Sequence, residues 1–479
     1  MNENSLFFVK VKDLAKKEVF TCQPTAQLSD IAKLMKEKNI SGIIVCEENF
    51  PLGVITDRDF RNKIIAENVN FSDLKVSQIM TAPVITVREE DYIFEAIYKM
   101  TKQNIHRLVV VNEMGQLTGI LTDTDIIKYQ TNTPLYFIRE LEYAGSFDDL
   151  KKINEKSVDM IRYMVKSGVR TSDLIRFISH INDAIILRAI EIVVKENYFE
   201  LPYNFSFLVL GSEGRMEQTL KTDQDNAIVY DDTIDEKSIK ILEDFSKKLI
   251  DGLIYIGIPE CPGGIMAKNS GWRKSLSQWK ATLTHWINLP EPENTLNYSM
   301  FSDLRTIYGN TDLENSLKQL VLSLVQENRL FLAHMAKNVL RFPPPLTFFG
   351  NIKVEKTGEH KGRFDIKKAG IFPLTEGIKV LALDAGIVDG GTRYKINKLM
   401  EKSFLPDEDM LEIETSFSFF IQLRLKSQLK DLEKGKTPSN FVSIDDLNHI
   451  DIERLKIGFS AVKTLQNTLK ERYNLNQIA

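Results

Sequence analysis

Two aspartates one residue apart, Asp223 and Asp225, have the residue type and spacing for metal chemistry. They stand at the start of an apolar run, and Gly211 and Ser212 follow the apolar run before it. If the segment is a strand, both carboxylates project from one face, where each raises the pKa of the other unless a cation intervenes. A divalent ion removes that penalty, and Mg²⁺ takes carboxylate and phosphate oxygens as ligands. The spacing therefore predicts a site for metal and phosphate.

Other motifs for metal or phosphate do not fit the chain. An EF-hand loop needs glycine at its sixth position, where this sequence has Ile228. The sequence contains neither a P-loop of the type GxxxxGKS/T nor an HExxH pair. Its three cysteines, Cys22, Cys46 and Cys261, lie far apart, which excludes a disulfide scaffold and a cysteine zinc site.

The strings around these residues resemble a known active site. GSEGRMEQ from Gly211, followed by DQDNA from Asp223, is similar to the nucleotidyltransferase superfamily, in which a Gly-Ser corner precedes Asp-x-Asp and a third acid lies on a later strand. The strings look like those of the nucleotidyltransferases that accompany CBS pairs, which are relatives of the bacterial protein-PII uridylyltransferase. The stretch from Cys261 to Ile287 also matches these relatives.

The resemblance implies a role for each part of the site. Three acids would be catalytic and would hold two Mg²⁺ ions: Asp223, Asp225 and Asp303. Five residues would bind the triphosphate of an NTP donor: Gly211, Ser212, Arg215, Lys268 and Arg273. The segment Asn297–Gly309 is strand-like and would place Asp303 and Arg305 on one face. Asp303 is also a candidate for activating the acceptor hydroxyl.

Three tryptophans, Trp272, Trp279 and Trp286, recur at seven residues. This spacing predicts one stripe of a helix that packs in the core. Arg273 and Lys274 would then stand at the start of that helix, where anions are favoured.

The first third of the chain contains an internal repeat. One copy begins at Val11 and the other at Val76, a period of about 65 residues, and both run strand, helix, strand, turn, strand. Both copies close with one signature, GVITDRD from Gly53 and GILTDTD from Gly119. The repeat resembles a tandem pair of CBS domains, a family that binds adenine nucleotides.

The CBS resemblance implies two ligand sites and a partner. Thr56 with Asp59, and Thr122 with Asp125, would hold the ribose and phosphates of an AMP- or ATP-type adenine nucleotide. A local role explains the same residues as well, with the threonines as helix N-caps and the aspartates as first-turn acids. CBS pairs often associate face to face, which implies a homodimer.

The fold class expected is multidomain α/β (α+β). The expected parts are a tandem CBS pair over 8–130, a helical connector over 131–200, a mixed-sheet nucleotidyltransferase domain over 201–310 and a helical bundle over 311–479. The bundle resembles the substrate-binding domain of the same family. Two pairs in it are candidates for facing the active site, or else lie on polar outer faces: Asp365 with Lys367, and Arg424 with Gln428. In the connector, His180 and Asp183 lie one turn apart and receive no role.

Composition limits the partners. The chain has 479 residues, 43% of them hydrophobic, and a net charge of −4, so it lacks the basic balance of a general nucleic-acid binder. No apolar run is long enough to span a bilayer, and the N-terminal MNENSLFFVK has no signal-peptide pattern. We therefore expect a cytoplasmic protein with neither a nucleic-acid nor a membrane partner.

The expected function is Mg²⁺-dependent transfer of a nucleoside monophosphate from an NTP to a hydroxyl of a partner protein, adjusted by adenine nucleotide bound to the CBS pair. PII uridylyltransferases also carry a metal phosphohydrolase domain, whereas this chain has no His-Asp dipeptide and no counterpart of their C-terminal sensing domains. Only the transferase half is therefore expected. Two alternatives remain open: a small-molecule nucleotidyltransferase, and a catalytically silent nucleotide-sensing scaffold.

Overall fold

A computed structural model describes most of the chain: residues 9–70, 74–129, 140–166, 168–197, 200–220, 223–347 and 351–477. The start of the predicted connector, residues 131–139, lies outside these ranges. The chain divides into two compact units, 1–143 and 144–479. Among the described residues, none of the helices combines the length and the apolar character needed to cross a membrane.

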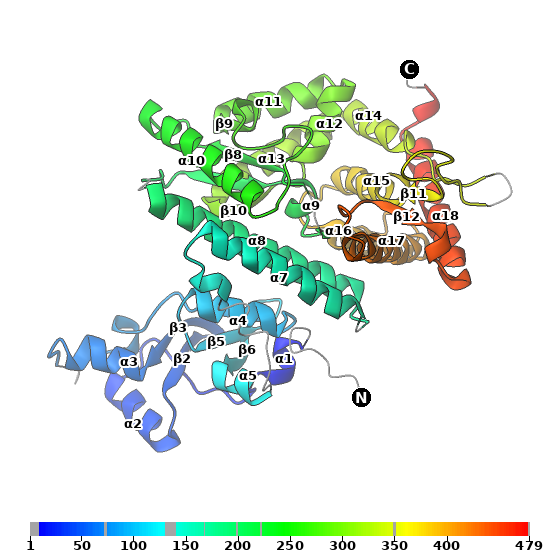
Figure 1. Ribbon diagram of the computed structural model, residues 1–479. Coiled ribbons are helices and arrows are strands. Elements are labelled where there is room, and N and C mark those ends of the chain that lie inside the picture. The colour runs from blue at the N-terminus through cyan, green and yellow to red at the C-terminus, as the bar shows by residue number, and fades with distance from the viewer. Residues whose placement is uncertain are drawn as a thin grey trace. The chain divides into compact units, whose positions relative to one another are not determined.

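The first unit contains two similar three-stranded sheets (Figure 1). In each sheet the first strand runs parallel to the second and the second runs antiparallel to the third. The strands of the first copy are β1 (Thr21–Cys22), β2 (Gly42–Glu47) and β3 (Phe50–Thr56), and those of the second are β4 (Thr86–Arg88), β5 (Arg107–Val111) and β6 (Leu117–Thr122). The helices are α1 (Val11–Leu14), α2 (Leu28–Lys38), α3 (Asp57–Asp59), α4 (Ile93–Lys102) and α5 (Asp123–Tyr129). The repeat predicted from the sequence is thus present in the fold.

Each copy is completed by the segment that precedes the other copy. Leu28 N, at the start of α2, donates to Leu74 O (2.9 Å), and Ile93 N, at the start of α4, donates to Val9 O (2.9 Å). The segment around Val11 therefore belongs structurally to the second copy, although it opens the first copy in the sequence. The two copies consequently fold as one unit.

The second unit contains a four-stranded mixed sheet. Its strands lie in the order β10 (Arg305–Gly309), β7 (Phe205–Val209), β8 (Asn226–Tyr230), β9 (Arg273–Ser275). β7 is antiparallel to both β10 and β8, whereas β9 is parallel to β8. Every residue of β7 and β8 is buried, as their continuous apolar runs predict. The mixed sheet predicted for the central domain is confirmed.

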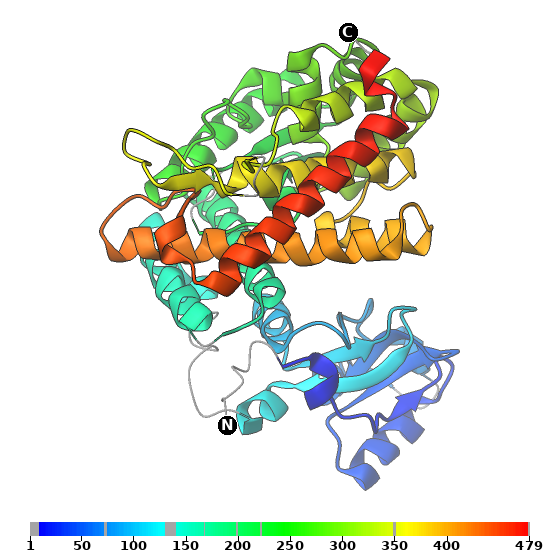
Figure 2. The same cartoon turned by 90° about the vertical axis from the view of Figure 1, so that its right-hand side faces the viewer.

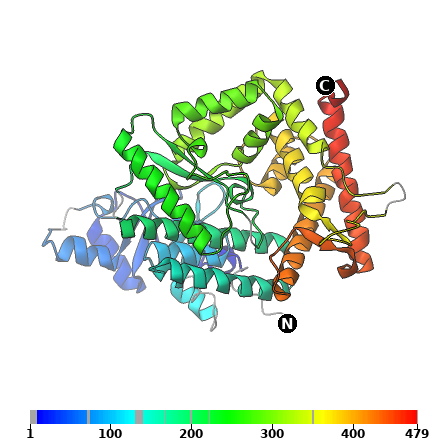
Figure 3. The same ribbon diagram turned by 45° about the horizontal axis from the view of Figure 1, so that its top comes forward.

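Helices flank this sheet and join it to the C-terminal part of the unit. The long helix α8 contacts β10, α10 and α17, so it connects the sheet to the bundle (Figures 1 and 3). These helices are α7 (Phe147–Lys166), α8 (Thr171–Asn197), α9 (Gly211–Gly214), α10 (Glu236–Tyr255), α11 (Leu276–Asn288), α12 (Pro292–Phe301) and α13 (Thr311–Glu327).

The last third is a helical bundle, as predicted. The orange α17 and the red α18 pack against each other and cross obliquely (Figure 2). The bundle comprises α14 (Arg329–Leu340), α15 (Phe372–Asp384), α16 (Thr392–Glu401), α17 (Asp407–Glu433) and α18 (His449–Arg472), with a small hairpin sheet of β11 (Arg363–Asp365) and β12 (Phe441–Ser443). Asn328 separates α13 from α14, since its side chain caps α14 by accepting from Phe331 N (3.2 Å).

Two local predictions were wrong. Asn297–Gly309 is not one strand: α12 continues to Phe301, and β10 begins only at Arg305. Trp272 lies in a 3₁₀ turn before α11 rather than on it, although its ring packs 5.9 Å from that of Trp279 in the predicted aromatic cluster. Arg273 and Lys274 accordingly form β9, and α11 begins after Ser275, which caps it. Tertiary pairing of β9 with β8 overrides the helical periodicity here.

Candidate active site

The Asp-x-Asp pair lies immediately before β8. Asp225 is buried, and its Oδ1 has no hydrogen-bond partner, whereas Asp223 is exposed. Burial raises the pKa of Asp225 above its usual range, and the charge of Asp223 adds to this rise. The two carboxylates are therefore close enough to repel each other, as their spacing predicts.

The Gly-Ser corner passes directly against this pair. Gly211 has φ +52°, and a Cβ at this position would lie 2.9 Å from Asp225 Oδ2. Leu210 N donates to Asp225 O (2.9 Å), which ties the corner to the start of β8. A side chain at residue 211 would thus meet both a backbone penalty and the carboxylate. The structure brings Gly211 and Ser212 next to the Asp-x-Asp pair.

Two cations of the C-terminal bundle face the same carboxylates. Lys367 has a solvent-exposed side chain, but the protein around it partly desolvates its ammonium, and this desolvation together with the charge of Arg424 lowers its pKa. The charges of Asp225 and Asp223 oppose that fall, so Lys367 lies near both carboxylates. Arg424 is buried on α17, and burial lowers its pKa to about 10 against the charges of Asp365 and Asp223. Of the candidate pairs in the bundle, Lys367 and Arg424 therefore lie near the Asp-x-Asp pair.

A thiol that no local sequence pattern marked as functional also lies here. Cys261 is buried and forms a hydrogen bond with the Asp225 side chain. Burial raises the pKa of Cys261 to about 11, and the Asp225 charge adds to this rise. The thiol therefore stays protonated and donates to the carboxylate. Its distance in sequence from Asp225 hid this contact.

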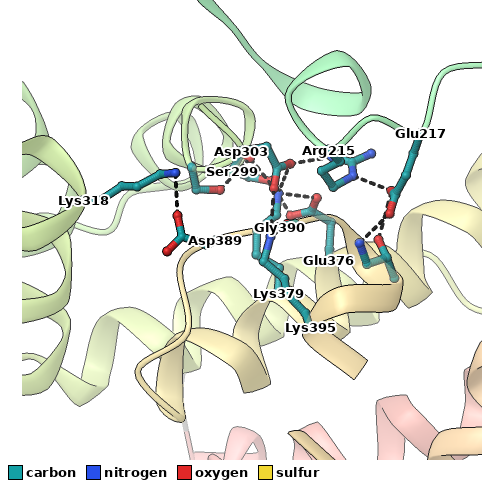
Figure 4. A network of polar contacts seen from close by, with 12 residues as sticks. Arg215, Glu217, Ser299, Asp303, Lys318, Glu376, Lys379, Asp389, Gly390 and Lys395 are labelled. Atoms are coloured by element: carbon teal, nitrogen blue, oxygen red, sulfur yellow. Dashed lines mark hydrogen bonds and ion pairs between the residues drawn. The ribbon is translucent and has the colours of Figure 1, made fainter. Parts of the chain in front are cut away.

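Asp303 lies in a buried ion-pair network (Figure 4). Its carboxylate contacts Arg215, Lys379 (2.8 Å) and Lys395 (3.5 Å), and its side chain is fully buried. Burial alone would raise the pKa of Asp303, but the charges of Lys379, Arg215 and Lys395 hold it far below the usual range. Asp303 is therefore ionised and strongly bound by cations.

The network links the GSEGR segment to the bundle. Glu376 accepts from Lys379 Nζ (2.8 Å) and from Ser299 Oγ. Glu217 accepts from Arg215 Nε (2.8 Å) and from Thr392 Oγ1 (3.0 Å) at the start of α16 (Figure 4). The contacts of Ser299 with Glu376 and of Thr392 with Glu217 were missed because they join residues 77 and 175 apart in the sequence.

The remaining predicted residues have other partners. Lys268 pairs with Glu260, and Arg273 NH1 donates to Ala267 O (2.8 Å) and to Lys268 O (3.1 Å). Arg305 does not share a face with Asp303; it forms a bidentate pair with Asp183 on α8 at 2.8 and 2.9 Å. Asp183, which received no role from the sequence, thus anchors the start of β10.

The fit of the acidic residues to a metal ion depends on which of their carboxylate oxygens are free. Among the described residues, no three His, Cys, Asp or Glu side chains gather as a metal-binding group. Asp225 Oδ1 is a buried carboxylate oxygen with no partner, and Asp223 lies beside it. An unpaired carboxylate oxygen and a second carboxylate fit a hard cation such as Mg²⁺, which commonly takes one or two carboxylates plus phosphates.

In the first unit, the signature aspartates make local contacts. Asp59 accepts from Thr56 N (2.9 Å), Thr56 Oγ1 (2.7 Å) and Thr81 Oγ1 (2.9 Å). Asp125 accepts from Thr122 N (3.1 Å). A cavity of about 310 Å³ adjoins the first signature and is lined by Thr56, Asp57, Arg58 and Asp59 together with His106 and Arg107 of the second copy.

Three family models match the chain. The CBS domain model matches residues 11–66 and 76–132. The model described as "Putative nucleotidyltransferase DUF294" matches residues 155–293, and "Putative nucleotidyltransferase substrate binding domain" matches residues 329–473. Together these matches cover both units of the fold.

Curated relatives match a quarter to a third of the chain. An uncharacterized protein of Methanocaldococcus jannaschii, MJ1232, is 41% identical over 120 residues, which is 25% of this chain and 39% of that protein. An uncharacterized protein of Methanopyrus kandleri, MK0525, is 34% identical over 149 residues, which is 31% of this chain and 71% of that protein. The chain thus spans only part of the length of these relatives.

Two solved structures of CBS proteins are similar to about a quarter of the chain. One is the CBS domain pair of protein MJ0100 in complex with 5′-methylthioadenosine and S-adenosyl-L-methionine. It is 29% identical, and the match covers 26% of this chain and 95% of that chain with a TM-score of 0.24. The other is the CBS domain protein PAE2072 of Pyrobaculum aerophilum complexed with AMP, which is 25% identical. This match covers 24% of this chain and 89% of that chain, with a TM-score of 0.23. By the three family models, the chain belongs to the family in which a CBS pair precedes a nucleotidyltransferase domain of the DUF294 type and its substrate-binding domain.

Proposed function

We propose that the chain transfers a nucleoside monophosphate from a Mg²⁺-bound NTP to a hydroxyl group. The observation that carries this proposal is the pair Asp223 and Asp225, with the unpartnered Asp225 Oδ1, beside the Gly211 corner. The acceptor oxygen would attack the α-phosphorus, the bond from that phosphorus to the oxygen bridging to the β-phosphate would break, and pyrophosphate would leave with both bonding electrons. The hydroxyl proton would pass to solvent or to a carboxylate.

Each residue of the site would have its own role in this reaction. Asp223 and Asp225 would hold Mg²⁺, which supplies charge neutralisation for the phosphates. Ser212 would contact the triphosphate from the corner. Asp303 is poorly suited to accept the hydroxyl proton, because its cations lower its pKa. Its contribution would instead be to hold Arg215 in place.

A protein is the acceptor that we favour. This preference rests on the resemblance of the GSEGR and DQDNA strings to protein-PII uridylyltransferase, which modifies a protein. A small hydroxyl compound is the second candidate, since the same carboxylate pair would serve either acceptor. A silent nucleotide-sensing scaffold is the third.

The CBS pair would adjust the transferase by binding an adenine nucleotide. Thr56, Asp57 and Arg58 line a cavity of about 310 Å³ to which the second copy contributes His106 and Arg107. Hydroxyl and carboxylate groups suit a ribose, and the basic groups suit phosphates. A homodimer formed through this unit is part of the proposal, and sedimentation of the full chain with and without AMP would check it.

Label transfer tests the reaction. Wild type, Asp223→Asn and the control Asp244→Asn, which removes an exposed charge on α10, would be incubated with cell lysate, Mg²⁺ and each α-³²P-NTP. A labelled protein band with wild type and the control, but not with Asp223→Asn or with EDTA, is the expected result. Label found only in small molecules would support the second candidate. Bound NTP without any transfer would contradict the proposal and leave the scaffold.

A further inference from the structure

A π-helical turn places a lysine of the bundle at the carboxylate pair. Residues Lys367–Ile371 form this turn between β11 and α15, and Lys367 is its first residue. Such turns are rare and occur often at functional sites, because the wider turn re-aims a side chain at a cost in regular hydrogen bonding. The position of Lys367 is thus set by an unusual piece of backbone.

Close packing fixes this turn. A Cβ at Gly370 would lie 2.5 Å from the ring of Phe420, and a Cβ at Gly458 would lie 2.7 Å from the same ring. The two glycines therefore let the π turn and α18 pack directly on either side of a buried α17 side chain. Ile366 N donates to Asn440 O (3.0 Å), which anchors the residue before Lys367. The turn has little freedom to move Lys367 away.

Neighbouring Lys367 and Lys368 differ in what they contact. The ammonium of Lys368 lies 3.9 Å from Asp365, and Lys368 N donates to Asp365 Oδ1 (3.1 Å). Lys367 is exposed and has no hydrogen bond or close ion pair to any described residue, while its charge interacts with Asp225 and Asp223. Its three donors are therefore available to a ligand bound between the bundle and the carboxylates.

The other cations near the pair are engaged by protein groups, Arg215 through two ion pairs and Arg424 through one of its nitrogens. Arg215 contacts Asp303 and Glu217, and Arg424 Nε donates to Asn440 Oδ1 (2.8 Å). A triphosphate bound at the Asp-x-Asp pair needs positive charge beyond that of a metal, because its β- and γ-phosphates carry most of the charge. Lys367 has both the location and the free donors for that task.

We propose that Lys367 binds the β- and γ-phosphates of the NTP donor and then the pyrophosphate that leaves. The proposal deepens the proposed function and gives the substrate-binding domain a part in donor binding in addition to acceptor binding. No bond of Lys367 forms or breaks; its ammonium forms charge-assisted hydrogen bonds to phosphate oxygens. A lysine suits this role because phosphates differ in orientation before and after transfer, and an ammonium binds them as a point charge.

Binding measurements test this without requiring turnover. The affinities of the full chain for Mg²⁺-pyrophosphate, for a non-hydrolysable NTP analogue and for the corresponding nucleoside would be measured by calorimetry for wild type, Lys367→Met and Lys368→Met. In the proposed function the transferase domain and the CBS pair both bind nucleotides, so nucleotide affinity alone does not report on one site. Pyrophosphate lacks the nucleoside and is therefore the decisive ligand. Lys367→Met is expected to lower the affinity of the chain for pyrophosphate about tenfold or more, whereas Lys368→Met should change it less than about twofold. Neither variant should change the affinity for the nucleoside.

Two further results complete the test. Lys367→Arg, which keeps the charge, is expected to recover most of the pyrophosphate affinity, and thermal unfolding would verify that each variant folds. Unchanged pyrophosphate binding in folded Lys367→Met, or equal losses in Lys367→Met and Lys368→Met, would overturn the proposal. If wild type binds pyrophosphate through Lys367 but transfers nothing, the proposed function fails while this assignment stands.

Discussion

Lys379 Nζ lies 2.8 Å from Asp303 Oδ2, with both side chains buried. Asp303 also contacts Arg215 of the GSEGR segment and Lys395 of α16, so one carboxylate joins the turn before β10 to the central corner and to two helices of the bundle. Removing one partner of a buried ion pair leaves the other charge uncompensated, which costs free energy of folding. This arrangement makes Asp303 a structural anchor of the second unit.

Asp303→Asn should therefore act mainly on stability. The substitution leaves three buried cations without their shared partner, and breaking a buried pair costs about 3–5 kcal/mol. Asp223→Asn, which removes an exposed charge that pairs with no cation in the described part of the chain, should change the free energy of unfolding by less than about 0.5 kcal/mol. Urea denaturation of both variants measures the difference. Equal stability of the two variants would show that Asp303 is not an anchor.

Glu213→Gln should change how stability depends on pH. Burial raises the pKa of Glu213 to about 8, and the charge of Asp183 adds to this rise. The folded chain thus keeps a proton that the unfolded chain releases above about pH 4.5, so stability contributed by this group falls as the pH rises from about 4.5 to 8. Glutamine does not titrate, so the substitution removes this pH-dependent contribution to stability. Urea midpoints between pH 5 and pH 8 should fall less steeply for the variant, and parallel curves would refute the raised pKa.

Arg305→Lys should weaken the anchor of β10. The guanidinium holds both Asp183 oxygens at 2.8 and 2.9 Å and also donates to Glu213 O (3.1 Å), a fork that an ammonium cannot reproduce. We expect a loss of about 1–3 kcal/mol in the free energy of unfolding. A double-mutant cycle with Asp183→Asn isolates the pair. A coupling energy near zero would mean that the contact contributes nothing measurable.

Gly391→Ala should separate α16 from the GSEGR segment. The backbone at Gly391 has φ −77°, which alanine adopts freely, but its Cβ would lie 2.5 Å from Arg215 O and 2.8 Å from Glu217 Oε1. The overlap should destabilise the chain by about 1–3 kcal/mol. Gly271→Ala is the matched control, because nothing lies within 4 Å of its Cβ. Chemical denaturation compares them, and equal stabilities would contradict the steric reason.

Local patterns in the sequence determined the elements and the centre of the site. The period of the apolar residues marked α8, α15 and α17, and the continuous apolar runs marked β7 and β8, because burial of one face or two requires those patterns. Asp223 and Asp225 could be paired from the sequence since they are one residue apart. The strand assigned to Asn297–Gly309 failed because the pattern of a short apolar run does not separate a helix end from a strand.

Only the tertiary structure decided which charges meet. Asp303 and Arg215 are 88 residues apart, and Thr392 and Glu217 are 175 apart, so nothing in their local sequence indicates a contact. Lys367 reaches the carboxylate pair through a π turn whose place depends on two glycines packed on Phe420. The sequence alone therefore determined which groups are available and what regular structure carries them. Packing determined their partners, because charges interact by distance in space and not by distance along the chain.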